Sequence, residues 1–161
     1  MTSAARVLEL LERQGATLAT AESLTGGRVA AALTAVPGSS ACFVGGVVAY
    51  ATAVKEWVLD VPAALIAEHG VVSSECARAM ASGVRNLTGA TYAVSTTGVA
   101  GPGEQDGVRP GTVYVGVAGP GPPTAVALEL PGDRSAVQEQ ATREALSAVA
   151  AILDVEETRL G

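Results

Sequence analysis

Helix-like and strand-like segments alternate along most of this 161-residue chain, and this alternation restricts the possible folds more than any other feature. Apolar spacing and end signals predict helices over 4–14, 25–33, 55–59, 62–68, 73–87 and a last one after Asp133. β-prone runs predict strands over 17–20, 44–50, 91–96, 112–117 and 125–130. The last two strands flank a Gly-Pro-rich loop, which favours an antiparallel pair. We therefore expect one α/β domain over 1–161, a three-layer α/β/α arrangement with a mixed sheet, and a frayed acidic tail after Asp154.

The 26 residues between Arg28 and Lys55 carry no charge, which is long enough to raise the question of a membrane span. Pro37, Gly38, Ser39 and Ser40 lie in the middle of this stretch and predict a turn, so a helix, a turn and a strand fit it better. The first residues lack the apolar core of a signal peptide. We expect a cytoplasmic protein that binds no membrane.

Few residue types suited to metal or acid–base chemistry are present. The chain has one histidine (His69), one lysine (Lys55), two cysteines (Cys42 and Cys76) and nine arginines. No pair has the spacing of a zinc site, so we expect no metal, no cofactor and no disulfide framework. A net charge of −6 and a pI near 4.7 argue against a nucleic-acid partner.

This inventory favours a serine hydrolase mechanism without histidine. His69 lies between short helical stretches, where a surface position at a helix end explains it better than catalysis. Lys55 can lose its proton when it is desolvated, whereas arginine effectively cannot. Tyr50 lies five residues earlier, and its phenol could share a proton with the amine. A serine activated by Lys55 with help from Tyr50 is therefore the best-supported scheme, although chance retention of one surface lysine explains Lys55 equally well.

Three loops are candidate positions for this chemistry. The first, 21–27, ends in Gly26-Gly27 at a helix start, which suits either an anion site or an ordinary helix cap. The second runs from Pro37 to Ser40 and leads to Tyr50 and Lys55. The third, 95–103, leaves a strand end as a flexible glycine-rich loop.

Ordered motifs cover nearly the whole chain, from about residue 5 to residue 152. They are Ala21-Glu22-Ser23-x-Thr25-Gly26-Gly27, Pro37-Gly38-Ser39-Ser40-x-x-Phe43-x-Gly45-Gly46-Val47-Val48-x-Tyr50-x-x-x-x-Lys55, Gly70-Val71-Val72-Ser73, Thr97-Gly98-Val99-Ala100-Gly101-Pro102, Pro110-Gly111-Thr112-Val113 and Gly132-Asp133-Arg134. In this series the chain resembles the CinA C-terminal domain family. The resemblance implies an amidohydrolase of pyridine nucleotide salvage, which hydrolyses the carboxamide of nicotinamide mononucleotide to nicotinate mononucleotide and ammonia.

The resemblance also implies roles for particular residues. The family's catalytic serine, tyrosine and lysine fall on Ser40, Tyr50 and Lys55. Substrate-binding positions are expected at Ser23, Thr25, Gly26, Gly27, Thr97, Gly98 and Arg134. Arg134 and the Gly26-Gly27 junction are the candidates for holding the nucleotide phosphate.

One geometric condition and one departure from the family pattern accompany these assignments. A straight strand over 41–50 would separate Ser40 from Tyr50 by roughly 30 Å. The assignment of Ser40 as the nucleophile therefore requires a helical turn over 40–44 or a contribution from a second subunit. Without either, Ser23 or Ser39 becomes the candidate nucleophile. Arg109-Pro110-Gly111-Thr112 is one residue shorter than the family's usual Lys-Pro-Val-Gly-Thr, which bears on substrate choice.

Two further expectations concern partners and activity. We expect a homo-oligomer, because small α/β enzymes often form symmetric assemblies. The alternative to an amidase is a catalytically inactive nucleotide-binding or competence-related partner protein, since the family includes members without deamidase activity.

Overall fold

A five-stranded mixed sheet forms the centre of the computed structural model, which describes residues 2–161. Its strands are β1 (Leu18–Glu22), β2 (Phe43–Val48), β3 (Tyr92–Gly98), β4 (Thr112–Ala118) and β5 (Thr124–Glu129), and their order is β2-β1-β3-β4-β5. β1 pairs in parallel with β2 and β3, whereas β4 is antiparallel to β3 and β5. The predicted mixed sheet and antiparallel final pair are confirmed.

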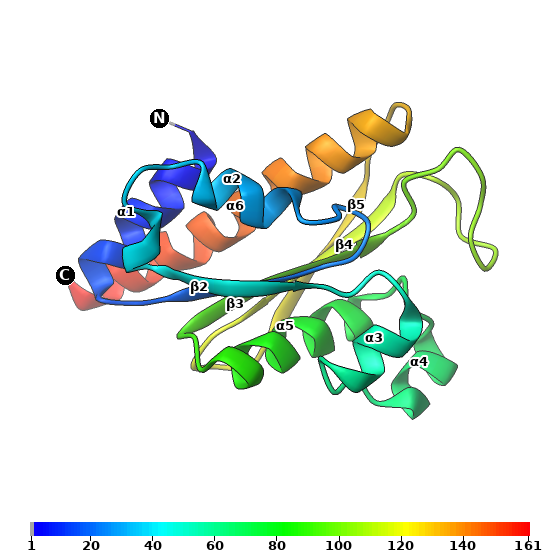
Figure 1. Ribbon diagram of the computed structural model, residues 1–161, viewed down its shortest axis with the longest axis horizontal. Helices are drawn as coiled ribbons and strands as arrows, with labels where there is room; N and C mark the ends of the chain where they lie inside the picture. The colour runs from blue at the N-terminus through cyan, green and yellow to red at the C-terminus, as the bar shows by residue number, and fades with distance from the viewer. Residues whose placement is uncertain (1) are drawn as a thin grey trace.

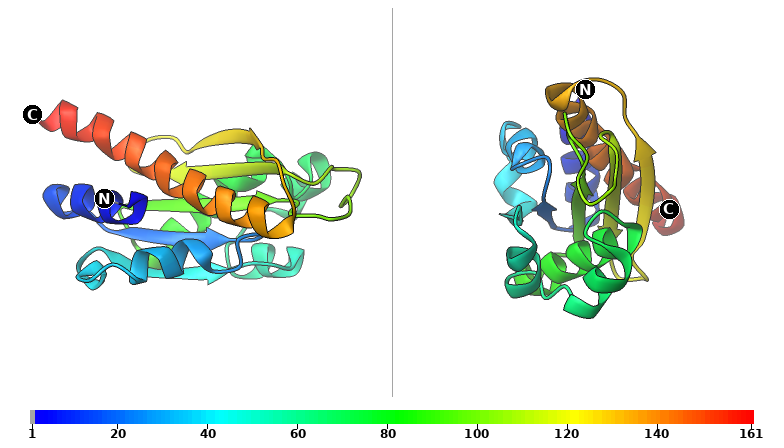
Figure 2. Two further views of the ribbon diagram at one scale, coloured as in Figure 1. Left: turned by 90° about the horizontal axis from the view of Figure 1, so that it is seen from above. Right: turned by 90° about the vertical axis from the view of Figure 1, so that its right-hand side faces the viewer.

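Helices cover both faces of this sheet, as the three-layer prediction requires (Figure 1). One layer contains α1 (Ser3–Gln14), α2 (Arg28–Thr34) and α6 (Arg134–Leu160); the other contains α3 (Thr52–Trp57), α4 (Ala63–His69) and α5 (Ser74–Thr88). Figure 2 shows α6 crossing the sheet diagonally and the loop after β3 projecting beyond the sheet end. Each layer has its own apolar cluster, the first around α1 and α6 and the second around α5.

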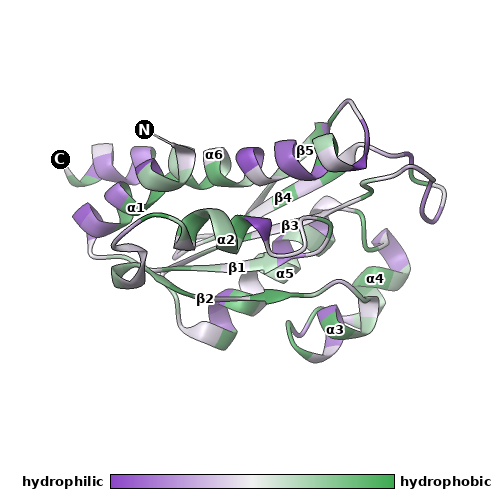
Figure 3. Cartoon of the chain, turned by 45° about the horizontal axis from the view of Figure 1, so that its top comes forward, coloured by the Kyte–Doolittle hydropathy of each residue, from purple (hydrophilic) through white to green (hydrophobic). Residues whose placement is uncertain are grey.

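The uncharged stretch divides where its turn residues predict. α2 ends at Thr34, a short 3₁₀ helix η1 covers Ser39–Ala41, and β2 follows from Phe43. Figure 3 shows hydrophobic residues along β2 and α2, separated by this turn. Among residues 2–161, no helix combines the length and the apolar character needed to cross a membrane.

Side-chain caps begin the helices that the sequence predicts. Ser73 accepts a hydrogen bond from the backbone N–H of Cys76 at 3.1 Å and opens α5. Asp133 does the same for α6 through the N–H of Ala136, at 2.9 Å. Gly15 ends α1 in the left-handed conformation that glycine favours. These caps fix the helix ends within a residue or two of the expected positions.

The expected fraying after Asp154 is wrong, because α6 continues to Leu160. Two ion pairs join its final turns to α1. Arg6 contacts Asp154 at 2.8 Å and Arg13 contacts Glu157 at 3.3 Å. The acidic residues of the tail therefore face the arginines of α1 and stay helical.

Candidate active site

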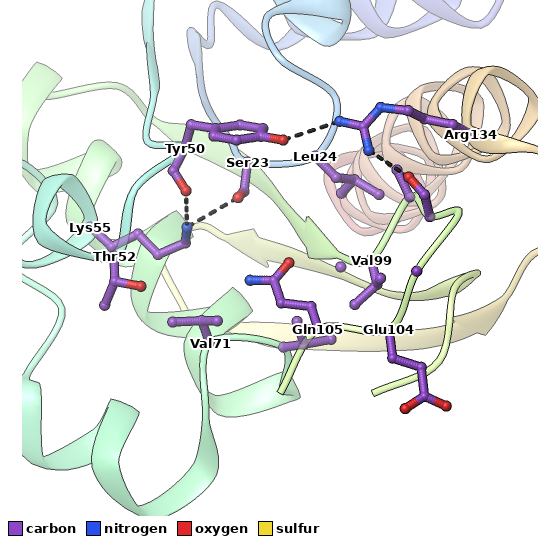
Figure 4. A pocket seen from close by; sticks show the side chains of 15 residues that line it. Ser23, Leu24, Tyr50, Thr52, Lys55, Val71, Val99, Glu104, Gln105 and Arg134 are labelled. Atoms are coloured by element: carbon purple, nitrogen blue, oxygen red, sulfur yellow. Dashed lines mark hydrogen bonds between the residues drawn. The ribbon is translucent and has the colours of Figure 1, made fainter. Parts of the chain in front are cut away.

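A pocket opens where β1 and β3 end and the chain leaves β2, beside the start of α6 (Figure 4). Its volume is about 370 Å³, within the range of small-molecule sites. Parallel strands end together at this edge of the sheet, which is where ligands bind in open α/β folds. Five residues predicted from the sequence line it: Ser23, Tyr50, Lys55, Gly98 and Arg134.

Lys55 lies on α3 and is only 2% exposed. Its ammonium nitrogen Nζ lies 2.8 Å from the carbonyl oxygen of Ala49 and 3.2 Å from that of Tyr50. The third contact, at 3.0 Å, joins Nζ to Ser23 Oγ. Within residues 2–161, no aspartate or glutamate forms an ion pair with this lysine. The amine is thus held by three oxygens and no negative charge.

Burial lowers the pKa of Lys55 from its usual 10.5, because a buried ammonium loses its hydration without a counter-charge. The neutral amine has two N–H donors and one lone pair. Both carbonyl oxygens can only accept, so they occupy the two donors. The lone pair is then left for Ser23 Oγ, whose hydroxyl must donate. Neutral Lys55 is therefore arranged as a base toward Ser23.

The phenol of Tyr50 does not contact Lys55, so the expected sharing of a proton between these two side chains is not seen. Only the backbone carbonyl of Tyr50 contacts Lys55. Tyr50 as a residue is 61% exposed, and its phenol oxygen accepts a hydrogen bond from Arg134 Nη2 at 3.1 Å. The direction in which the chain leaves β2 turns the ring toward α6 (Figure 4). Tyr50 is thus paired with the pocket's guanidinium and not with its amine.

Arg134 is the first residue of α6 and spans two parts of the pocket wall. Its Nη1 donates to the carbonyl oxygen of Gly101 at 2.6 Å, and its Nη2 contacts Tyr50. No carboxylate pairs with it in the described part of the chain. Its charge is therefore available to an anionic ligand.

The helix start at Gly26-Gly27 is already filled by a side chain. Buried Glu22 accepts hydrogen bonds from the backbone N–H groups of Val29 at 2.8 Å and Ala30 at 3.1 Å. Its carboxylate thus occupies the place that an anionic ligand would take at α2. Thr25, Gly26 and Gly27 lie outside the pocket lining, and the Thr25 hydroxyl donates to Glu22 at 2.6 Å. The structure favours the helix-cap interpretation over the phosphate site.

Ser40 lies at the opposite end of β2 from Lys55. The helical turn over 40–44 that its assignment requires is absent, because η1 covers only Ser39–Ala41 and β2 begins at Phe43. Six strand residues cover about 20 Å, which carries the chain away from Ser40 before it reaches Tyr50. Ser40 is exposed, and neither it nor Ser39 lines the pocket. Within one chain, Ser23 holds the position beside Lys55 that the resemblance assigns to Ser40.

Thr97 and His69 also lie outside the pocket lining. Thr97 is buried, and its hydroxyl donates to the carbonyl oxygen of Val71 at 2.7 Å. This bond fastens the segment Val71–Val72, which lines the pocket, to the end of β3. His69 ends α4, with Nδ1 3.8 Å from Glu75 Oε1, as its surface interpretation predicts.

A small hairpin lies at the pocket mouth, next to the end of a glycine-rich loop for which the sequence predicts flexibility and no regular structure. Gln105 and Val108 exchange two backbone hydrogen bonds of 3.0 and 2.9 Å. Asp106 and Gly107 between them have φ values of 52° and 76°, as a two-residue turn with both φ positive requires. The dipeptide Asp-Gly is a strong hairpin signal and could have revealed this element. Glu104 and Gln105 of this hairpin line the pocket.

Comparison with protein families and curated proteins gives a consistent result. A family model described as CinA C-terminal domain matches residues 1–153. A CinA-like protein of Frankia casuarinae is 50% identical over 147 residues, which are 91% of this chain and 34% of that protein. A CinA-like protein of Myxococcus xanthus is 51% identical over 137 residues, 84% of this chain and 32% of that protein. The chain thus spans about a third of the length of these relatives.

Solved structures match along nearly their whole length. A CinA superfamily protein from Klebsiella pneumoniae has a TM-score of 0.91 and 38% identity, covering 94% of this chain and 96% of that one. The competence/damage inducible protein CihA from Agrobacterium tumefaciens has a TM-score of 0.89 and 32% identity, with 94% and 93% covered.

Proposed function

Because the chain belongs to the CinA C-terminal domain family, we propose that it is an amidohydrolase that converts nicotinamide mononucleotide to nicotinate mononucleotide and ammonia. The contact between Ser23 Oγ and Lys55 Nζ, at 3.0 Å inside the pocket, carries this proposal. In this pair the serine hydroxyl is the nucleophile, and the buried lysine, whose pKa is lowered, is the base that takes its proton. The substrate itself is taken from the sequence resemblance.

The reaction proceeds through an acyl-enzyme. Ser23 Oγ attacks the carboxamide carbon as its proton passes to Lys55 Nζ, giving a tetrahedral intermediate. Lys55 returns the proton to the leaving nitrogen, the C–N bond breaks, and ammonia departs. Water then attacks the ester, giving its proton to Lys55, which passes it to Ser23 Oγ as the acid is released. One base serves both halves of the reaction.

Backbone N–H groups beside Ser23 would stabilise the oxyanion. Leu24 directly follows the nucleophile and lines the pocket, and its backbone N–H donates to no acceptor in the described chain. The N–H of the residue after a nucleophilic serine is a recurrent oxyanion donor in hydrolases. Arg134, on the opposite side of the pocket, would bind the nucleotide phosphate in place of the Tyr50 hydroxyl. The carboxamide would then point toward Ser23 and the phosphate toward α6.

A homo-oligomer paired through β2 would bring Ser40 to a neighbouring site. β2 is an edge strand, and Val44 and Val48 on it are each 50% exposed. A two-fold axis perpendicular to the sheet would align two β2 strands antiparallel. The Ser40 end of one copy would then lie beside the Tyr50 end of the other. We propose Ser23 as the nucleophile and keep Ser40 as a prediction that depends on this pairing.

Ammonia release from nicotinamide mononucleotide tests the proposal. We expect activity in the wild type, loss in Ser23→Ala and Lys55→Arg, and little change in Ser147→Ala, an exposed serine on α6. Full activity in Ser23→Ala together with loss of activity in Ser40→Ala would show that Ser40, and not Ser23, is the nucleophile. A wild type that releases no ammonia but binds the nucleotide saturably would favour the inactive nucleotide-binding protein.

A further inference from the structure

Gln105 is presented to the pocket by a rigid element. Its backbone is fixed on both sides of the Asp106–Gly107 turn by the two hydrogen bonds with Val108. A two-residue hairpin whose central residues both have positive φ is among the best-defined short loops. The point at which the Gln105 side chain leaves the backbone is therefore fixed, although the residue belongs to an exposed loop.

The side-chain amide of Gln105 has no hydrogen-bond partner among residues 2–161, and it points into the pocket, toward the side where Ser23 and Lys55 lie (Figure 4). The neighbouring Glu104 carboxylate points away from that side in the same view. Much of the adjacent wall is apolar, formed by Leu24, Val71 and Val99. A free polar group with one acceptor and two donors thus faces the reacting end of the pocket.

We propose that Gln105 determines specificity for a carboxamide, with its Oε1 accepting a hydrogen bond from the substrate's –NH₂ group. This inference rests on the proposed amidase function and extends it to the choice of leaving group. Ser23 and Lys55 attack and transfer protons, so neither can also hold the departing nitrogen before attack. An amide oxygen opposite that nitrogen favours an amide over an ester, because only the amide has an N–H to donate to it, whereas an ester oxygen can only accept and would require the Gln105 amide to turn over.

Two substrates with the same acyl group separate recognition from general damage to the site. One is nicotinamide mononucleotide, and the other is its analogue in which a methyl ester replaces the carboxamide. Both give the same acyl-enzyme, but ammonia leaves from one and methanol from the other. The ratio of their kcat/KM values therefore reports on the leaving group alone.

We expect Gln105→Ala to lower kcat/KM for the amide by about three- to tenfold, the effect of one hydrogen bond, and to change the ester value much less. Gln105→Glu keeps acceptor oxygens at this place and should retain more amide activity than Gln105→Ala. Asp106→Asn is the matched control on the same hairpin, because asparagine also tolerates a positive φ, and it should leave both values unchanged.

Equal losses on both substrates, or no loss on either, would overturn the role of Gln105 while leaving the amidase intact. A wild-type chain that hydrolyses neither substrate would instead overturn the proposed function, and the inference with it.

Discussion

Lys55 concentrates the chemistry of the pocket in one side chain. It is the single lysine of the sequence, it is nearly inaccessible to solvent, and it contacts Ser23 and two carbonyl oxygens. An arginine at this position would keep its proton at any physiological pH. Among residues 2–161, Lys55 is the one buried cationic side chain, so the choice of lysine over arginine there has a chemical reason. Composition alone could not distinguish that reason from chance.

The rate of amide hydrolysis should depend on the ionisation of Lys55. Burial lowers the pKa of this lysine from 10.5, and only its neutral form can take the proton of Ser23. We expect kcat/KM to rise with pH, with a logarithmic slope of about 1 below that pKa, and to level off above it. Lys55→Arg should lower kcat/KM by at least about a hundredfold across the range. A pH-independent rate in the wild type would contradict the assignment of Lys55 as the base.

The same lowered pKa makes stability depend on pH. Unfolding restores the ordinary pKa of 10.5, so between the lowered value and 10.5 the unfolded chain binds the proton more tightly. Stability contributed by Lys55 should therefore rise with pH through this window. Cys76 faces this lysine, and burial raises its pKa from 9.0 to about 11, so its contribution to stability is lost as pH rises through that range, opposite to the effect of Lys55.

Urea unfolding of the wild type and Lys55→Met over a series of pH values isolates the lysine's part of this dependence. The wild type should gain stability relative to the variant as pH rises toward 10.5. A difference in the free energy of unfolding that does not change with pH would show that the folded pKa is ordinary.

At the scale of elements, Glu22 joins the end of β1 to the start of α2. One carboxylate accepts hydrogen bonds from Val29, Ala30 and Thr25, and it adjoins Ser23. Glu22→Gln replaces one acceptor oxygen by an NH₂ group among three donors, so we expect a loss of about 1–3 kcal/mol in the free energy of unfolding. Urea denaturation measures it. Glu139→Gln on α6 is the matched control, because this exposed glutamate forms no side-chain hydrogen bond or ion pair among residues 2–161, and it should differ from the wild type far less.

Close contact between α5 and β4 depends on a glycine. A Cβ added at Gly116 would fall on the carbonyl oxygen of Ala77 in α5 and within 2.6 Å of Ser95 Oγ. Gly116→Ala should therefore lower the free energy of unfolding by about 1–3 kcal/mol or more, as overpacking of a core does. Gly121→Ala, with no atom within 4 Å of its added Cβ, is the matched control. Equal melting temperatures for the two variants would contradict this packing.

The elements were largely predictable because their signals are local. Ser73, Asp133 and Gly15 mark helix ends through contacts within a few residues, and the structure confirms each of them. The extent of α6 was not predictable, because Arg6 and Arg13 meet its acidic tail only after the chain has folded. Glu22 was equally hidden, since nothing in its neighbourhood marks it as the cap of a helix six residues later.

At the scale of the whole molecule, the exposed edge of the sheet predicts self-association through β2. We expect the wild type to sediment above the 16.0 kDa of one chain and Val44→Lys to sediment as a monomer. Val155→Lys is the control, because Val155 is 52% exposed on α6, on a different element. An active monomeric wild type would exclude Ser40 from the reaction, because no second copy would then be present to supply it.

The pocket as a whole was only partly predictable, because it depends on how distant loops meet. Spacing placed Tyr50 and Lys55 together, and the family motifs added Ser23, Gly98 and Arg134, all of which line it. Sequence distance could not show that Ser23 reaches Lys55 across 32 positions. Parallel pairing of β1 with β2 brings the two strand ends together and settles that contact.

The burial of Lys55 also determines how this protein reacts with reagents for primary amines. Its only lysine side chain is 2% exposed, so bulky acylating dyes and cross-linkers meet no lysine on the surface of the folded chain. A small electrophile that enters the pocket meets an amine that burial makes more nucleophilic at neutral pH. Covalent labelling of the lysine side chain, read separately from labelling of the N-terminal amine, would therefore report on occupancy of the pocket without background from other lysines.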